Sequence, residues 1–250
     1  MRVRKPASAA ALVAVALAVA VIAGCGGVSY NHSARMPVLN YTAVQGAKTG
    51  ESQPMMIVYG DGGTYRLTWL MQYEKGTLTD AQVADLLGWM KGQGFMSLDP
   101  ATFKAKKPGT YPRTRIVVSL SDKSNVVEGP ASDAKLQPYV KKIDSVTPSN
   151  ESKWQPSNFM LSAKVLVSAP QGARITAWPY DPLILAEAAG TSPKAVTGQT
   201  ATQVWNTIAN DFNSIPPDYV NNTAPQVVYS AGGKLYGSIY AVPMFPMPGV

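Results

Sequence analysis

Cysteine and histidine, the residue types that most often carry nucleophilic or metal chemistry, each occur once in the chain, as Cys25 and His32. A single cysteine cannot form a disulfide within the chain, and two ligands of these types cannot fill the three or four protein positions of a zinc site. Catalysis that relies on histidine would have only His32, which lies in a run of mostly small and polar residues. The sequence therefore predicts no metal, no cofactor and no histidine-dependent active site.

Acidic residues and one serine–lysine motif are the remaining candidates for catalysis. Ser132 and Lys135 fit the Ser-x-x-Lys pattern of penicillin-recognising enzymes, and Lys48-Thr49-Gly50 matches a second motif of that family. The two motifs stand in the reverse order here, so Ser132 or Asp133 is better explained as a helix N-cap. Glycan hydrolysis needs two carboxylates about 5 to 9.5 Å apart. The sequence cannot show such a pair among its 15 scattered acidic residues, and a cell-wall glycan hydrolase stays the alternative to a non-enzymatic protein.

The N-terminus has the pattern of an export signal. Arg2, Arg4 and Lys5 precede an uncharged run, 9–24, which is mostly alanine and valine. As a helix this run would span roughly 24 Å, less than the ~30 Å hydrocarbon core of a bilayer. A cleaved signal peptide therefore explains the segment better than a membrane-spanning anchor.

The uncharged run ends in Ile22-Ala23-Gly24-Cys25, which resembles the cleavage site of bacterial lipoproteins with a type II signal peptide. The resemblance implies cleavage before Cys25, a diacylglyceryl group on its sulfur, and acylation of the new amino terminus. Several acyl chains on one residue form a stable membrane anchor, because each buried CH₂ contributes ~0.8 kcal/mol. We therefore expect a signal peptide at 1–24, a lipidated tether at 25–36, and a body held at the cell membrane outside the cytoplasm.

The composition is typical of a folded, exported protein and argues against a nucleic-acid partner. Of the 250 residues 46% are hydrophobic and 15% are charged, which is enough apolar material for a core. Loss of 1–24 removes three of the 22 basic residues and no acidic residue. The mature chain then has 19 basic against 15 acidic residues, a net charge of +4, which is too small for a nucleic-acid footprint.

The pattern of apolar residues in 37–146 predicts hairpins that alternate with helices. We expect strands at 55–59 and 64–74 around the turn Gly60-Asp61-Gly62-Gly63, and a helix that begins after the cap Thr79 with its partner Gln82. Strands at 113–120 and 126–128 and a helix at 133–146 follow. The predicted fold class is α+β, with antiparallel sheets built from hairpins and helices packed on one face.

A proline-containing polar segment at 147–158 predicts a linker to a second α+β unit at 159–250, or to a continuation of the first. Tyr59-Gly60-Asp61-Gly62, Gly94-Phe95, Trp178-Pro179 and Val196-Thr197-Gly198 together resemble a group of uncharacterised secreted bacterial lipoproteins. The resemblance implies an exported α+β lipoprotein and no particular activity.

Two groups of side chains could form a binding surface. The first is a basic segment without acids that contains Lys104, Lys106, Lys107, Arg113 and Arg115. It could meet anionic lipid headgroups or wall polymers, or it could be a solvated loop. The second group is aromatic and contains Trp178, Tyr236 and Tyr240; the last two would share a strand face and could stack on a sugar or peptide, or they could be core residues.

The sequence as a whole predicts a lipid-anchored envelope protein that binds or scaffolds a partner and is not an enzyme. The expected partners are the membrane, through the N-terminal lipid, and a cell-wall polymer, an anionic lipid or an envelope protein.

Overall fold

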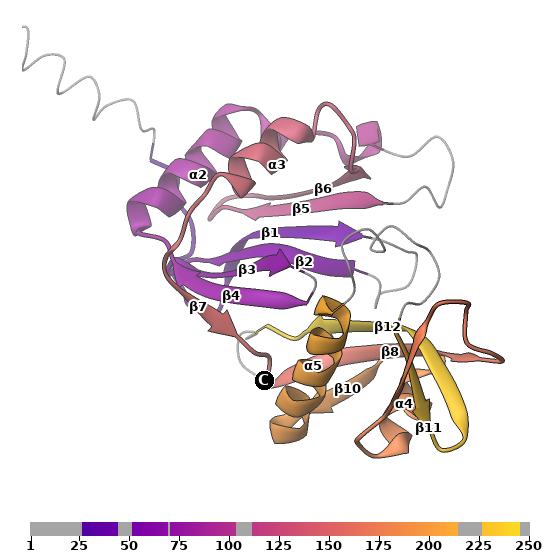
Figure 1. Cartoon of the computed structure of the whole chain (residues 1–250). Helices are drawn as coiled ribbons and strands as arrows, with labels where there is room; N and C mark the ends of the chain where they lie inside the picture. The colour runs from indigo at the N-terminus through magenta and orange to yellow at the C-terminus, as the bar shows by residue number, and fades with distance from the viewer. Residues whose placement is uncertain (1–26, 45–51, 70, 104–111, 215–226, 246–250) are drawn as a thin grey trace, which may run out of the picture.

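Seven strands of the N-terminal part pair in one antiparallel sheet. The computed structural model describes residues 27–44, 52–69, 71–103, 112–214 and 227–245 (Figure 1). The strand order is β6-β5-β1-β2-β3-β4-β7, and every neighbouring pair is antiparallel. The strands are β1 (Pro37–Val44), β2 (Ser52–Tyr59), β3 (Gly63–Trp69), β4 (Gln72–Thr77), β5 (Arg113–Ser119), β6 (Ser124–Pro130) and β7 (Ser149–Trp154).

The alternating run 64–74 forms two strands, so the prediction of one strand there is wrong. Trp69 of β3 pairs with Gln72 of β4, and Met71 lies in the turn that joins the two strands. Met71 in this turn has φ 55°, a left-handed conformation that costs a non-glycine residue roughly 1–3 kcal/mol. Its side chain is buried in the core, which offsets that cost. The turn lacks the Gly, Asn or Pro that would mark it in the sequence.

Most of the predicted linker 147–158 belongs to the first sheet. β7 pairs antiparallel with β4, with Trp154 opposite Tyr73 and Lys153 opposite Glu74. β7 is therefore the edge strand of this sheet, and the prediction of a linker at 149–154 is wrong. Edge strands carry polar residues on their solvent side, which is why this segment looks like a linker in the sequence.

Helices α2 (Asp80–Gly92) and α3 (Gln137–Asp144) cover one face of the first sheet (Figure 1). The capping box at the start of α2 is confirmed: the Gln82 backbone N–H donates to Thr79 Oγ1 (3.2 Å), and the Thr79 backbone N–H donates to Gln82 Oε1 (2.9 Å). Two short 3-10 helices, η2 (Phe95–Ser97) and η3 (Pro100–Phe103), follow α2. Buried residues of the helices and sheet form one core, which includes Leu39, Val58, Leu86, Leu87, Met90, Phe95, Ile116, Leu136 and Ile143.

The C-terminal half forms a second, separate sheet with the order β10-β8-β12-β11-β9. Its strands are β8 (Asn158–Leu166), β9 (Arg174–Ala177), β10 (Lys194–Thr197), β11 (Val227–Ala231) and β12 (Lys234–Pro243), and its helices are α4 (Pro182–Ala188) and α5 (Gly198–Asn213). All pairings are antiparallel except β9 with β11, which is parallel. The predicted α+β class with antiparallel-rich sheets is confirmed. None of the helices in the described ranges is long and apolar enough to cross a membrane.

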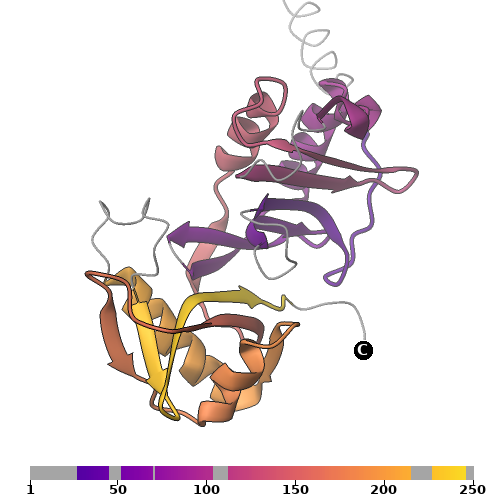
Figure 2. The same cartoon turned by 90° about the vertical axis from the view of Figure 1, so that its right-hand side faces the viewer.

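A second core joins the two units. Trp205 of α5 and Phe245 after β12 lie against Tyr73 of β4, with ring centroids 6.1 and 5.4 Å from the Tyr73 ring. Ile57 and Tyr59 of β2 belong to the same core. The middle of the first sheet is thus buried on both faces, by α2 and α3 on one side and by the second unit on the other (Figure 2).

Most of the segment predicted as a tether packs on the body. Tyr30 is 4% exposed and its hydroxyl donates to Asp80 Oδ1 at 2.5 Å. His32 Nδ1 lies 3.1 Å from the same carboxylate oxygen, while its side chain stays 62% exposed. A Cβ on Gly60 would lie 1.6 Å from the backbone oxygen of Asn31, so only glycine fits against this segment. Residues 28–36 are therefore part of the folded body, and the predicted tether 25–36 is too long.

Replacement of Trp205 should weaken the contact between the units. Trp205 is 2% exposed and packs against rings of both units. We expect Trp205→Ala to lower the free energy of unfolding by about 3–5 kcal/mol, because it removes a buried aromatic side chain and leaves a cavity. Denaturant unfolding followed by circular dichroism measures the loss. The matched control is Leu183→Ala on α4, where the side chain is 61% exposed and the expected change is within about 0.5 kcal/mol. Equal effects of the two changes would contradict the role of Trp205.

Candidate functional site

The predicted basic surface is partly neutralised where the structure describes it. Lys104, Lys106 and Lys107 lie outside the described residues. The Arg113 side chain is 15% exposed, and its Nε donates to Glu128 Oε1 on the neighbouring strand at 2.8 Å. Arg115 is exposed on the same strand. An arginine that is held by a carboxylate across β5 and β6 has a structural role, so Arg113 is a poor candidate for binding an anion.

The aromatic surface predicted from Trp178, Tyr236 and Tyr240 does not exist as such. Trp178 is 7% exposed and Tyr236 is 2% exposed, and a buried ring cannot stack on an external ligand. Tyr236 lies opposite Val165 of β8, whereas Tyr240 lies opposite Ser162. β12 thus carries one extra residue between them, which turns Tyr240 to the other face of the sheet. The prediction of a shared face is wrong because the sequence does not show this bulge.

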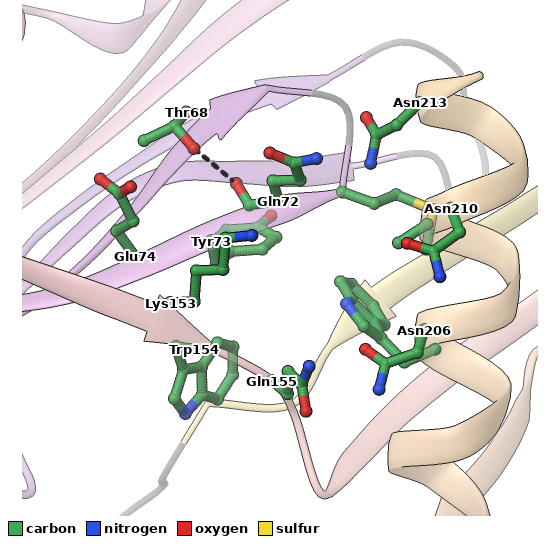
Figure 3. Close-up of a pocket in the computed structure, with 13 residues that line it drawn as sticks. Thr68, Gln72, Tyr73, Glu74, Lys153, Trp154, Gln155, Asn206, Asn210 and Asn213 are labelled. Atoms are coloured by element: carbon green, nitrogen blue, oxygen red, sulfur yellow. Dashed lines mark hydrogen bonds between the residues drawn. The ribbon is translucent and has the colours of Figure 1, made fainter. Parts of the chain in front are cut away.

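A cleft lies instead where α5 meets the edge of the first sheet (Figure 3). Its cavity volume is about 100 Å³, and the hollow is open to solvent on one side. One wall comes from β3, β4 and β7, and the other wall comes from α5. The lining residues are Thr68, Met71, Gln72, Tyr73, Glu74, Lys153, Trp154, Gln155, Trp205, Asn206, Ala209, Asn210 and Asn213. Because the hollow is open on one side, it suits a ligand that lies across it better than one that is fully enclosed.

Amide side chains are the main polar groups of the cleft. Asn206, Asn210 and Asn213 follow one another at four and three residues along α5, and this spacing places them on one side of the helix. Figure 3 shows them on the side that faces the strands, with Gln72 and Gln155 across the cleft. The spacing of the asparagines is visible in the sequence, and it is the signal that could have revealed this wall. The two glutamines have no such pattern.

These amides are available for a ligand. Among the described residues, no hydrogen bond engages the side chains of Gln155, Asn206 or Asn210. The Oδ1 atom of Asn213 is buried and accepts no hydrogen bond from the described residues. A buried acceptor without a donor costs about 1–3 kcal/mol. Because a ligand cannot reach this buried oxygen, the amides that a ligand can reach include those of Gln155, Asn206 and Asn210.

Aromatic rings form the floor of the cleft and hold its walls together. Trp154 stacks on Phe245, with centroids 5.0 Å apart and an angle of 14° between the planes. Tyr73 meets Trp154 edge to face at 6.1 Å, and its hydroxyl donates to the backbone oxygen of Pro54 at 2.8 Å. Tyr73 is buried, while Trp154 is half-buried and presents part of its ring to the cleft.

Two contacts on the far side of α5 fix the helix that carries the asparagines. The Tyr229 hydroxyl donates to Asp211 Oδ2 at 2.8 Å, and Arg174 forms an ion pair with the other oxygen of this carboxylate. One turn earlier, the Tyr180 and Thr207 hydroxyls lie 2.7 Å apart. These contacts tie α5 to β9, β11 and the segment before α4, so the amide row is held on a rigid element.

The charged groups of the cleft do not match the chemistry of a glycosidase. Glu74 is the one carboxylate among the described residues that line the cleft, and Lys153 lies opposite it on β7. Hydrolysis of a glycosidic bond needs a second carboxylate within about 10 Å, which the lining does not supply. No group of three or more His, Cys, Asp or Glu in the described ranges could hold a metal ion.

Comparison with known proteins finds no matching family model, no matching curated protein and no matching solved structure. Any functional conclusion for this chain therefore rests on the chemistry of the cleft and on the N-terminal sequence.

Two buried tyrosines next to the cleft should make the fold sensitive to high pH. Burial raises the pKa of Tyr73, and burial together with the hydrogen bond to Asp211 raises the pKa of Tyr229, both above the usual 10. In the folded state these phenols stay protonated where the unfolded chain would ionise. The free energy of unfolding should thus be constant from about pH 8 to about pH 10 and then fall by about 1.4 kcal/mol per pH unit for each such tyrosine.

Denaturant unfolding at a series of pH values measures this decline. The variant Tyr73→Phe serves as the comparison, because it removes one of the two phenols and keeps the ring. Its stability should fall less steeply above pH 10 than that of the parent protein. Equal slopes in the two proteins would show that Tyr73 is not held protonated by the fold.

Proposed function

We propose that the protein is a lipid-anchored, extracytoplasmic binding protein, and that the cleft between α5 and the first sheet binds a neutral, hydroxyl- and amide-rich ligand of the glycan type, as found in a cell-wall polymer. The observation that carries this proposal is the row of unengaged asparagine amides on α5, which faces two glutamines across the cleft. The export and lipidation part rests on the resemblance of residues 22–25 to a lipoprotein cleavage site.

The polarity of the cleft favours a neutral ligand over an ion. Each side-chain amide offers two donors and one acceptor, so a row of amides matches a ligand whose hydroxyl or amide groups both donate and accept. Among the described lining residues, Glu74 and Lys153 contribute one charge of each sign, so their charges sum to zero. A strongly anionic polymer or a free phosphate would find one lysine here, which is not enough for tight binding by charge.

The aromatic floor suits the apolar face of a sugar ring. The half-buried ring of Trp154 lies near Gln155, and Asn206 on α5 lines the opposite wall of the cleft. Ligand sites commonly combine apolar and aromatic surface with a few polar groups that fix orientation, which is the combination found here. Because the cleft opens to solvent, a polymer could lie in it with both ends outside.

Loss of two amides from α5 should weaken this binding. We expect the double variant Asn206→Ala/Asn210→Ala to lower the affinity for purified cell-wall sacculi roughly tenfold, since two neutral hydrogen bonds contribute about 1–3 kcal/mol together. Sedimentation of the protein with sacculi at low and moderate salt measures the bound fraction. Binding by amides should survive the higher salt, whereas binding by the basic segment should not.

The control for this experiment is Gln203→Ala, which removes an exposed amide from the same helix but from outside the cleft lining. It should pellet like the parent protein. If the double variant also pellets like the parent, the cleft does not bind the wall. Soluble fragments released from the sacculi would instead support the glycan hydrolase.

Lipidation is tested by the variant Cys25→Ser. In a bacterial host we expect the parent protein to enter the detergent phase on phase separation and to carry acyl chains on its N-terminal peptide by mass spectrometry. The variant should lack the acyl mass and should stay in the aqueous phase, because it has no sulfur to receive the diacylglyceryl group. A parent protein that keeps an unmodified Cys25 and fractionates with soluble proteins would overturn this part of the proposal.

A further inference from the structure

The N-terminal segment lies along α2 in a defined direction. A Cβ on Gly88, near the C-terminal end of α2, would lie 3.3 Å from Cγ2 of Val28. Two residues later, the hydroxyl of Tyr30 reaches Asp80, the first residue of α2. The chain therefore runs antiparallel to α2, and it enters the body at the C-terminal end of this helix.

Several further contacts hold the segment in place. Ser121 donates its backbone N–H to the Ser29 backbone oxygen at 2.9 Å, and the hydroxyls of the two serines are also 2.9 Å apart. At the other end, the Gly60 backbone N–H donates to the Met36 backbone oxygen at 3.1 Å. These bonds join the segment to the loops between β5 and β6 and between β2 and β3. The docked segment is thus a fixed part of the first unit.

Only two residues, Gly26 and Gly27, separate Cys25 from Val28, so three Cα–Cα steps span the distance. At 3.3–3.6 Å per residue, even a fully extended chain gives a reach of about 10 Å. From this geometry we infer that the C-terminal end of α2 is a membrane-facing surface, which the short link holds against the lipid headgroups. The inference rests on the proposed lipidation of Cys25. The occupant of this surface is the bilayer to which the lipid anchor belongs.

The side chains at this end of α2 suit a membrane surface. Lys91 is exposed in the last turn of α2, one turn after Gly88. Trp89 is half-buried in the same turn of α2, and the Lys142 ammonium group, which also pairs with Asp85 at 3.0 Å, lies over the indole ring at 5.9 Å from the centroid. Tryptophan is enriched at the membrane–water interface, and lysines near an anionic surface each contribute about 1 kcal/mol.

This orientation places the cleft on the side away from the membrane. In Figures 1 and 2 the second unit with α5 lies at the opposite end of the molecule from α2 and α3. The amide row would then face the wall, while the first unit would serve as the support that stands on the membrane.

The test couples the mature chain, residues 25–250, to vesicles through its own cysteine. Cys25 is the only cysteine of the chain, so a maleimide lipid attaches at the sulfur that would carry the diacylglyceryl group. The vesicles contain phosphatidylcholine and phosphatidylglycerol. Lysines are then acylated with a water-soluble reagent, and mass spectrometry compares each lysine in the coupled and the free protein. We expect the reactivity of Lys91 to fall severalfold, and that of Lys164 and Lys234 in the second unit to stay unchanged.

Two variants separate the short link from other causes of protection. A Gly/Ser insert of about 20 residues between Gly26 and Gly27, with an r.m.s. reach of about 25 Å, should restore the reactivity of Lys91. Tyr30→Ala, which loosens the docked segment, should restore it as well. Equal protection of Lys91 and Lys234, or protection of Lys91 that persists with the insert, would overturn the inference. Because the coupling is chemical, these outcomes do not depend on whether cells lipidate Cys25, which the Cys25→Ser experiment decides.

Discussion

The middle of the first sheet has to be covered on both faces, and the arrangement of the molecule depends on this constraint. Met56 and Val58 of β2 pack in the core with α2 and α3, while Tyr59 of β2, Tyr65 of β3 and Tyr73 of β4 pack in the core shared with the second unit. An antiparallel sheet can leave one face to water, but a face with Tyr59, Met71 and Tyr73 would expose a large apolar patch. The second unit covers that face through Trp205 and Phe245. The two units are therefore one structure with two cores.

The cleft is a consequence of how this aromatic contact ends. Trp205 and Ala209 of α5 pack in the core shared by the two units. The residues that directly follow them, Asn206 and Asn210, therefore lie at the edge of the contact between the units. At this edge the first sheet ends, at the short turn before β4 and at the edge strand β7. The sheet and α5 are no longer in contact there, which leaves the cleft between them. Polar side chains at such an edge lose little hydration, and they can be selected for binding rather than for stability. The amides of Asn206 and Asn210 occupy this position.

Short-range sequence patterns predicted most helices and strands of this fold. Features that depend on pairing between distant strands could not be predicted from the sequence. The capping residues Thr79 and Gln82 and the hairpin at Gly60 to Gly63 are short-range features, and the structure confirms both. The edge strand at 149–154 is polar because it has one wet side, so composition alone assigned it to a linker. Tyr236 and Tyr240 are four residues apart, yet a bulge that depends on the pairing with β8 separates them onto two faces. The spacing of the asparagines on α5 is visible in the sequence, but Gln72 of β4 and Gln155 just after β7 lie more than 50 residues away from them in the chain.

Docking of residues 28–36 changes what a lipid anchor would do for this protein. A flexible tether leaves a domain free to rotate above the membrane, and each binding event then has to restrict that motion. Because the chain is docked on the body from Val28 onward, only a short link would join the body to a lipid on Cys25. The orientation of the body relative to the membrane would then be largely set before a ligand binds. If the cleft binds a wall polymer as proposed, a fixed orientation would raise the effective concentration of correctly placed clefts near that polymer. The buried Tyr30 and the glycine at position 60 would then serve function as well as stability, because they hold the support to which the cleft is attached.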